Sequence, residues 1–309
     1  MARFRPRLAQ APKCVRPGPL PWPQQVRWTL DHRSRVRWHS AAPPPKSSES
    51  VAADEIAKFS RMSSEWWAPQ GPFQILHLMN PARVQFIRDS VARYGLAHPT
   101  APSHAPLQNV SVLDVGCGGG LLCEALARLG AKITGVDASH ENIQIAKIHA
   151  NQDPRLTQAP LTYTHTTAEA LRDQAQQFDL VTAMEVVEHV CNPRQFVATL
   201  LQLAKPNGLV VMSTISRTYL AYALTILVAE HLLRLTPPGT HDHAKYLQPQ
   251  ELQAMLEHQG TAQVLETRGL WYMPHQARWR LMESDMGPWG TQANYILVAR
   301  KLPTTTQGS

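Results

Sequence analysis

The feature that most constrains the fold is a series of short apolar runs that alternate with helical periods from Val110 onward. Helical periods occur near Leu121–Leu129, Glu141–Ala150 and Ala168–Gln176. Strands that alternate with helices form a mostly parallel sheet covered on both faces, so we expect a Rossmann-like α/β fold. The predicted strands, about seven in all, are 110–115, 132–138, 161–167, 178–184, 208–214, and two near Ala262–Thr267 and Tyr295–Ala299.

A glycine-rich turn follows the first of these strands. Gly116, Gly118, Gly119 and Gly120 lie between that strand and the next helix. Glycine is needed where the backbone turns sharply and a ligand approaches without a Cβ atom in the way. Asp137 ends the second strand, 21 residues after Gly116, and an acid at that spacing suits hydrogen bonds to ribose hydroxyls. The pattern predicts a nucleoside-containing cofactor, with a purely structural turn as the alternative.

Two cofactor classes compete for this turn. A dinucleotide fingerprint requires GxGxxG, but Leu121 stands where its third glycine belongs. The run from Asp114 to Gly120 fits D-x-G-x-G-x-G, the form used by enzymes that bind S-adenosylmethionine. We therefore expect S-adenosylmethionine at this loop rather than a dinucleotide.

A second polar motif follows the fourth strand, where ligands bind in open α/β sheets. Glu185, Glu188 and His189 form an ExxEH element, and in a helical turn these three positions share one face. Two carboxylates and an imidazole suit a divalent cation, with Mg²⁺ favoured by oxygen ligands. The alternative is a polar turn in which His189 makes only local hydrogen bonds.

The positive charge of the chain is concentrated at its N-terminus. The formal net charge is +7, but residues 1–45 contain eight arginines, one lysine and a single acid, Asp31. The remainder is close to neutral, so a nucleic-acid groove is not expected. An Arg-rich, acid-poor N-terminus is typical of an organellar transit peptide, and a disordered basic arm is the alternative.

The remaining segments divide the chain into regions. Residues 46–106 are expected to be a helical preface with linkers, 107–302 the main domain, and 303–309 a disordered tail. Residues 218–236 form an apolar helical stripe whose core, Leu220–Ala229, is too short to span a bilayer. We expect this helix to contact a membrane surface or a partner, and a buried helix over the site is the alternative.

Several segments, in order, resemble the ubiquinone biosynthesis O-methyltransferase family. They are EIAKF from Glu55, Glu65-Trp66-Trp67, LHLMNPAR, VLDVGCGGGLL, TGVDAS, MEVVEHV, LAKPNG, PPGTHDHAKYL and QPQEL. The resemblance covers about two thirds of the chain. It implies a class I S-adenosylmethionine-dependent methyltransferase fold with the cofactor held by Arg83, Gly116, Asp137 and Met184. It also implies a divalent metal at the ExxEH residues.

The resemblance further implies the reaction and its place. Its substrates would be the phenolic hydroxyls of 3,4-dihydroxy-5-polyprenylbenzoate and demethylubiquinol. The enzyme would lie on the matrix side of the mitochondrial inner membrane, in a complex with other ubiquinone-biosynthesis proteins. Because a phenol has a pKa near 10, a cation or a base would have to generate the phenolate. His189, Glu185 and Glu188 are the candidates for that role.

Other interpretations remain open at the level of sequence. The chain could methylate another small phenol, or serve as a non-catalytic scaffold of a membrane-associated complex. Trp66 and Trp67 could form a lid over the cofactor or simply pack on the sheet. The run Trp271–Pro274 is a candidate aromatic wall for the substrate ring. The stretch from Ala277 to Thr291 matches the family poorly, and no role is assigned to it.

Overall fold

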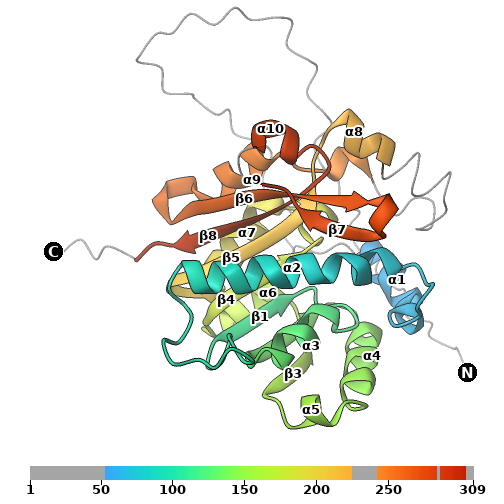
Figure 1. Ribbon diagram of the computed structural model, residues 1–309, viewed down its shortest axis with the longest axis vertical. Coiled ribbons are helices and arrows are strands. Elements are labelled where there is room, and N and C mark those ends of the chain that lie inside the picture. The colour runs from blue at the N-terminus through green and yellow to red at the C-terminus, as the bar shows by residue number, and fades with distance from the viewer. Residues whose placement is uncertain (1–52, 225–241, 284–285, 304–309) are drawn as a thin grey trace, which may run out of the picture.

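The computed structural model describes residues 53–224, 242–283 and 286–303. The basic segment 1–45, most of the apolar stripe 218–236 and the tail from 304 lie outside the described residues. The described chain forms one α/β unit around an eight-stranded sheet (Figure 1).

The sheet has the strand order β3-β2-β1-β4-β5-β8-β6-β7. The first five strands pair in parallel, and β8 is antiparallel to both β5 and β6. The expected α/β class is confirmed, with one strand more than the sequence predicted. The eight strands are β1 Ser111–Val115, β2 Lys132–Asp137, β3 Leu161–His165, β4 Phe178–Met184, β5 Ala204–Ile215, β6 Ala262–Met273, β7 Arg278–Leu281 and β8 Asn294–Lys301.

The additional strand, β7, lies in a stretch to which the sequence assigned no element. It pairs with the end of β6 as an antiparallel hairpin, with Tyr272 opposite Trp279. Its four residues alternate between exposed and half-buried positions, which is the period of a strand with one packed face. Four residues are too short a run to be identified securely from alternation alone.

Helices cover both faces of the sheet. One core contains Phe86, Ile87, Leu122 and Leu126 with Val112 of β1, so α2 and α3 lie on that face, and α2 runs along it (Figure 1). The other core contains Phe196, Leu200 and Leu252, from α7 and α9, with Leu113. Adjacent strand residues therefore point into opposite cores, as the strand period requires.

Several helices, among them α4 and α6, begin at a residue whose side chain caps the helix. Ser139 accepts a hydrogen bond from the backbone N–H of Asn142 at the start of α4, and Thr167 caps α6 in the same way. The α-helices are α1 Ala53–Arg61, α2 Gln74–Arg93, α3 Leu121–Arg128, α4 His140–Ala150, α5 Pro154–Thr157, α6 Ala168–Asp173, α7 Pro193–Leu203, α8 Tyr219–Tyr222, α9 Pro249–Leu256 and α10 Gly287–Gly290. The 3₁₀ turns are η1 Ser63–Glu65, η2 Val187–His189, η4 His243–Lys245, η5 His258–Gly260 and η6 Pro274–Gln276.

Candidate active site

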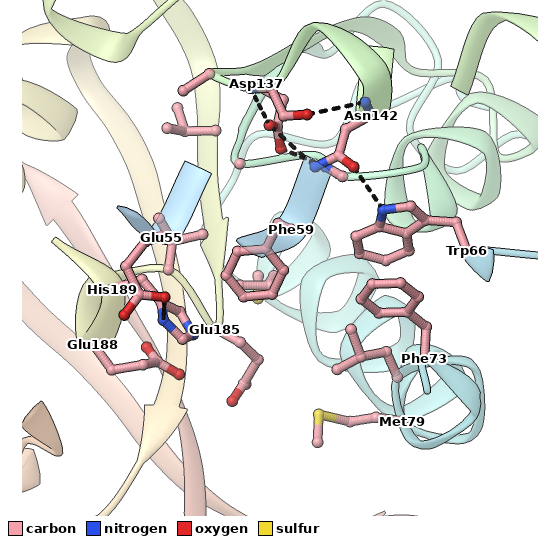
Figure 2. Close-up of a pocket in the computed structure, with 18 of the residues that line it drawn as sticks. Glu55, Phe59, Trp66, Phe73, Met79, Asp137, Asn142, Glu185, Glu188 and His189 are labelled. Carbon is pink, nitrogen blue, oxygen red and sulfur yellow. Dashed lines mark hydrogen bonds and ion pairs between the residues drawn. The ribbon is translucent and has the colours of Figure 1, made fainter. Parts of the chain in front are cut away.

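A cavity of about 410 Å³ lies at the carboxyl ends of β1, β2 and β4. Its wall is built from segments that are far apart in the sequence, including α1, the glycine turn, the residues after β4, and the β6–β7 hairpin. Figure 2 shows the part of this wall that runs from Asp137 to Glu188. Of the seven predicted site residues, Arg83 alone is not part of the lining.

The glycine turn has the backbone conformation that its residues were expected to allow. Gly116, Gly118 and Gly120 have φ angles of 72°, 53° and 87°, in the left-handed region where side chains are strained. A Cβ atom at Gly118 would lie 2.2 Å from the Cζ2 atom of Trp66. The loop therefore needs glycine both for its backbone angles and for the close approach of Trp66.

Asp137 lies beside this turn and holds it in place. Its carboxylate accepts hydrogen bonds from the backbone N–H of Gly118 (2.9 Å) and of Ser139 (2.8 Å), and from the side chain of Asn142 (3.3 Å). Burial raises its pKa, and these hydrogen bonds partly oppose that effect. A carboxylate has about four acceptor sites, and the hydrogen bonds from described residues occupy three of them, which is compatible with the predicted bond to a ribose hydroxyl.

Trp66 and Trp67 cover the glycine turn. Trp66 stacks on Phe73 with ring centroids 3.8 Å apart, and its indole N–H donates to Asn142 (2.9 Å; Figure 2). The indole N–H of Trp67 donates to the carbonyl of Gly119 at 3.0 Å. Trp66 also lines the cavity. Both side chains therefore pack against the glycine turn, and a role as a lid over the cofactor stays a prediction.

Arg83 and Met184 occupy different positions around the cavity. Met184 ends β4 and lines the cavity, where a polarizable thioether suits a sulfonium or a base. Arg83 lies behind the lining, with its Nη2 atom 3.2 Å from Oε1 of Glu185. This contact is an ion pair without hydrogen-bond geometry, and the buried Nε atom has no hydrogen-bond acceptor among the described residues. The chemistry of a guanidinium suits the carboxylate of S-adenosylmethionine, but Arg83 is not in the cavity lining, so its cofactor-binding role stays a prediction.

The ExxEH element is not the helical turn that the sequence predicted. Only Val187–His189 form a turn, of the 3₁₀ type, and Glu185 precedes it with a φ of 56°. Positive φ is uncommon for glutamate. Its backbone N–H donates to Ser213 (3.0 Å), and its carboxylate accepts from the Ser213 hydroxyl (2.6 Å). The expectation that Glu185, Glu188 and His189 share one helical face is therefore wrong.

Glu188 is the most deeply buried acid of this element, at 4% exposure. Burial raises its pKa to about 7, and the neighbouring charge of Glu185 adds to the shift. Its Oε2 atom accepts a hydrogen bond from Thr214 at 2.8 Å. Glu188 is thus held in a fixed position with a pKa near neutrality.

His189 faces a residue that the sequence did not identify as functional. Its Nδ1 atom lies 3.2 Å from Oε2 of Glu55 in α1 (Figure 2). The ammonium group of Lys245 lies 2.6 Å from the other oxygen of Glu55. Burial alone would raise the pKa of Glu55, but the hydrogen bonds from His189 and Lys245 hold it at about 2. The EIAKF segment was the one available signal for Glu55, as part of a resemblance and without a role.

The three predicted metal ligands do not form a metal site as they are arranged. Among the described residues, no group of three or more His, Cys, Asp or Glu side chains is placed to hold a metal ion. Glu185 contacts Arg83 and Ser213, Glu188 contacts Thr214, and His189 contacts Glu55. The donor types suit a divalent cation but the geometry does not fit it, so the metal-ligand role stays a prediction.

The end of the cavity away from Asp137 is largely apolar. Ile215, Leu224, Tyr272, Pro274 and Trp279 contribute to its lining. Tyr272 and Pro274 come from the predicted aromatic wall, whereas Trp271 and Met273 are not in the lining, because alternate strand residues face opposite ways. Trp279 lies in the stretch to which no role was assigned. Its pairing with Tyr272 across the hairpin brings it to the site.

Comparison with known proteins gives consistent matches. A family model described as "Methyltransferase domain" matches residues 81–266. The mitochondrial ubiquinone biosynthesis O-methyltransferase of Arabidopsis thaliana is 43% identical over 82% of this chain and 76% of its own length. The ubiquinone biosynthesis O-methyltransferase of Bartonella quintana is 42% identical over 81% of this chain and 96% of its own length.

Solved structures agree on the fold. The magnesium protoporphyrin IX methyltransferase ChlM from Synechocystis PCC 6803, with bound SAM, superposes with a TM-score of 0.51. The match covers 82% of this chain and all of that one, at 15% sequence identity. At that identity the likeness shows a shared class I methyltransferase fold.

Proposed function

The chain belongs to the ubiquinone biosynthesis O-methyltransferase family, and we propose that it methylates phenolic hydroxyls of polyprenylated catechol and quinol intermediates. Its methyl donor is S-adenosylmethionine. The proposed acceptors are 3,4-dihydroxy-5-polyprenylbenzoate and demethylubiquinol, which are the substrates implied by the family resemblance.

One observation carries this proposal: a single cavity joins three chemically distinct regions. Gly116 and Asp137 form the region suited to a nucleoside, and His189 lies in the lining beside Glu188. Tyr272 and Trp279 provide an aromatic, apolar region. A ring with an apolar tail and two hydroxyls matches the last two regions, and the methyl donor matches the first.

The residues of the cavity suit proton removal from a phenol. S-adenosylmethionine, when bound, supplies a methyl group on a positively charged sulfur. His189 accepts the phenolic proton at Nε2, because its Nδ1 atom faces the carboxylate of Glu55. Met184 and the glycine turn would hold S-adenosylmethionine with its methyl group facing the phenol, S-adenosylhomocysteine would be the leaving group, and much of the rate enhancement would come from that positioning.

The experiment combines binding and turnover on the purified protein. We expect calorimetry to show S-adenosylmethionine binding, and a short-chain polyprenyl dihydroxybenzoate to be methylated. His189→Gln should lower kcat by about 10²- to 10⁴-fold, the usual contribution of a general base, with unchanged cofactor affinity. Methylation of simple catechols alone would favour a different phenol as substrate. Cofactor binding without any methylation would favour the scaffold interpretation.

The predicted divalent cation requires its own test, and no step above depends on it. Protein treated with a chelator would be assayed before and after addition of Mg²⁺. If Glu185, Glu188 and His189 bind the cation, turnover should fall on chelation and return with Mg²⁺. Full turnover in the chelator would contradict the metal role while leaving the methyltransferase proposal intact.

We propose peripheral contact with a membrane for the surface beside the cavity. Tyr219 and Trp289, in α8 and α10, are 80% and 76% exposed. The hydroxyl of Thr218, the N-cap of α8, donates to the carbonyl of Gln292, just after α10. Leu224 is both exposed and part of the cavity wall, so an apolar tail could pass between this surface and the site.

The proposed contact is peripheral, and the described helices agree with that. No helix within residues 53–224, 242–283 and 286–303 is long and apolar enough to cross a membrane. Flotation with liposomes containing anionic lipid tests the contact: Tyr219→Ser with Trp289→Ser should reduce the bound fraction. Ile148→Ser is the matched control, because Ile148 is an exposed apolar residue of α4. Equal flotation of all three proteins would contradict membrane contact.

The name of one relative and the N-terminal composition support a proposed place of action. The Arabidopsis relative is named as mitochondrial, and residues 1–45 have the composition of a transit peptide. We propose the matrix side of the mitochondrial inner membrane, together with other ubiquinone-biosynthesis proteins. Import of the full chain into isolated mitochondria, compared with a chain lacking residues 1–45, tests this location.

A further inference from the structure

The preface helix α1 presents two side chains to the active-site histidine. Glu55 and Phe59 are one helical turn apart and therefore lie on the same face. Glu55 contacts Nδ1 of His189 at 3.2 Å, and the ring of Phe59 meets the imidazole edge-on with centroids 5.1 Å apart. Figure 2 shows both side chains directed at His189. The imidazole is thus held by a carboxylate and an aromatic ring from one helix.

The carboxylate determines which nitrogen of His189 carries a proton. The Glu55 carboxylate is paired with the ammonium group of Lys245 at 2.6 Å, and a glutamate carboxylate beside a cation is ionised at neutral pH and only accepts hydrogen bonds. The hydrogen of the 3.2 Å contact must therefore belong to Nδ1 of His189. In the neutral ring this leaves Nε2 with its lone pair free to accept a proton.

Lys245 fixes Glu55 from another segment of the chain. Its ammonium group, in η4, donates to Oε1 of Glu55 at 2.6 Å, while His189 contacts Oε2. The side chain of Glu55 is only 12% exposed, so this arrangement is shielded from water. Each carboxylate oxygen has its own partner, and the orientation of the carboxylate is set by two groups 190 and 134 positions away in the sequence.

We propose that Glu55 is a positioning residue for His189, which selects the Nδ1–H form of the imidazole and directs Nε2 at the substrate hydroxyl. This inference rests on the proposed function of His189 as the base. It gives the helical preface a part in the reaction: α1 covers the cavity and also supplies the group that orients the base.

A merely structural role of Glu55 would have different consequences. If the carboxylate only anchored α1 to the rest of the molecule, its removal would lower stability and loosen the cover over the cavity. It would not select one form of His189. Its effect on turnover would then be independent of whether His189 is present.

The experiment uses Glu55→Met, which keeps length and helix propensity but removes the acceptor, and Glu55→Gln, which keeps a neutral acceptor. We expect Glu55→Met to lower kcat by about 10- to 100-fold and Glu55→Gln to lower it less. Affinity for S-adenosylhomocysteine, measured by calorimetry, should stay within about twofold of wild type. Glu65→Gln, at an exposed acid of the same preface, is the matched control.

Two further measurements separate positioning from anchoring. In the double variant Glu55→Met with His189→Gln, kcat should equal that of His189→Gln alone, because the two residues act as a unit. In ¹⁵N-histidine spectra, the His189 resonances, assigned by their loss in His189→Gln, should report the Nδ1–H form in wild type. Glu55→Met should show a mixture of the two forms.

The contrary outcomes are distinct. Wild-type kcat in Glu55→Met together with a large loss in His189→Gln overturns the positioning role and leaves the proposed base in place. Losses that multiply in the double variant also overturn the positioning role. Wild-type kcat in His189→Gln overturns the base assignment and this inference with it. If Glu55→Met does not fold, Glu55→Gln carries the same kinetic and spectroscopic tests.

Discussion

The two ends of the cavity are built in opposite ways. One end, lined by Gly118 and Asp137, is the proposed nucleoside end. There the hydrogen bond from the Gly118 N–H to Asp137 joins residues 19 positions apart, on two neighbouring strand ends. The other end, lined by His189 and Trp279, is the proposed phenol end. There His189 contacts Glu55, 134 positions away, and Glu55 contacts Lys245, 190 positions away. The first end is a local supersecondary motif, whereas the second exists only when α1, η2 and η4 meet.

This difference leads us to expect that the two ends tolerate substitution differently. The glycine turn is constrained by backbone angles and by close contacts, so a single methyl group disturbs it. The phenol end is constrained by contacts between side chains of distant segments, such as the contact of His189 with Glu55. We therefore expect the largest effects on cofactor affinity at the nucleoside end, and only small effects on substrate KM at the apolar wall.

The largest effect on stability and cofactor affinity is expected for Gly118→Ala. The added Cβ would meet the Trp66 ring, which is held by Phe73 and Asn142 and does not yield easily. We expect a destabilisation of about 2–4 kcal/mol and a loss of S-adenosylhomocysteine affinity of about 100-fold or more. Thermal unfolding and calorimetry measure the two quantities.

The variant Gly95→Ala is the control that separates the cost of backbone strain from the cost of the steric clash with Trp66. Gly95 also has a positive φ, of 79°, but nothing lies within 4 Å of an added Cβ. The variant should lose only about 1–2 kcal/mol and should keep its cofactor affinity. Equal losses in both variants would show that the contact with Trp66 is unimportant.

A smaller effect is expected for Asp137→Asn. The amide keeps the shape of the carboxylate but removes the charge that accepts from the Gly118 N–H and from a ribose hydroxyl. Hydrogen bonds to a charged group contribute about 1.5–3 kcal/mol, so affinity for S-adenosylhomocysteine should fall by about 10- to 100-fold. At saturating cofactor, kcat should change much less, which steady-state kinetics would show.

The control for Asp137 is Asp173→Asn, because Asp173 is an exposed acid on α6 with a side chain 64% accessible. The Asp173→Asn variant should bind the cofactor with the affinity of the wild-type protein. If Asp137→Asn kept full affinity, the assignment of the nucleoside end to this strand terminus would be wrong.

The smallest effect is expected at the apolar wall, for Trp279→Leu. Loss of an aromatic contact costs about 0.5–1.5 kcal/mol, so KM for the phenolic substrate should rise by about two- to tenfold. Cofactor affinity should not change. Arg280→Gln, the next residue but on the exposed side of β7, should leave KM unaltered. A changed cofactor affinity in Trp279→Leu would remove the distinction between the two ends.

The sequence anticipated the nucleoside end more completely than the phenol end. Gly116, Asp137 and Met184 were identified from the ends of strands and from the family resemblance, and the structure places all three in one cavity. Strand ends and glycine turns are local signals, because the parallel sheet brings them to one edge wherever the helices lie.

The phenol end was anticipated only in part, for a physical reason. The spacing of ExxEH suggested a helix, but the positive φ of Glu185 directs its carboxylate to Arg83 and Ser213 instead. Glu55 gave no chemical signal, since an acid in the first turn of a helix is ordinarily a solvated residue that favours the helix dipole. Trp279 reaches the site through the β6–β7 hairpin, and the second strand of that hairpin is too short to predict from the sequence.

The sequence by itself determined the α/β fold, the glycine turn with its acid, and the family to which the chain belongs. These features depend on residue order over a few tens of positions, where periodicity and motif spacing act directly. Only the tertiary structure decided that α1 closes the cavity and that Glu55 faces His189 (Figure 2). Contacts between distant segments depend on packing and burial, which convert an ordinary surface acid into a shielded partner of the candidate base.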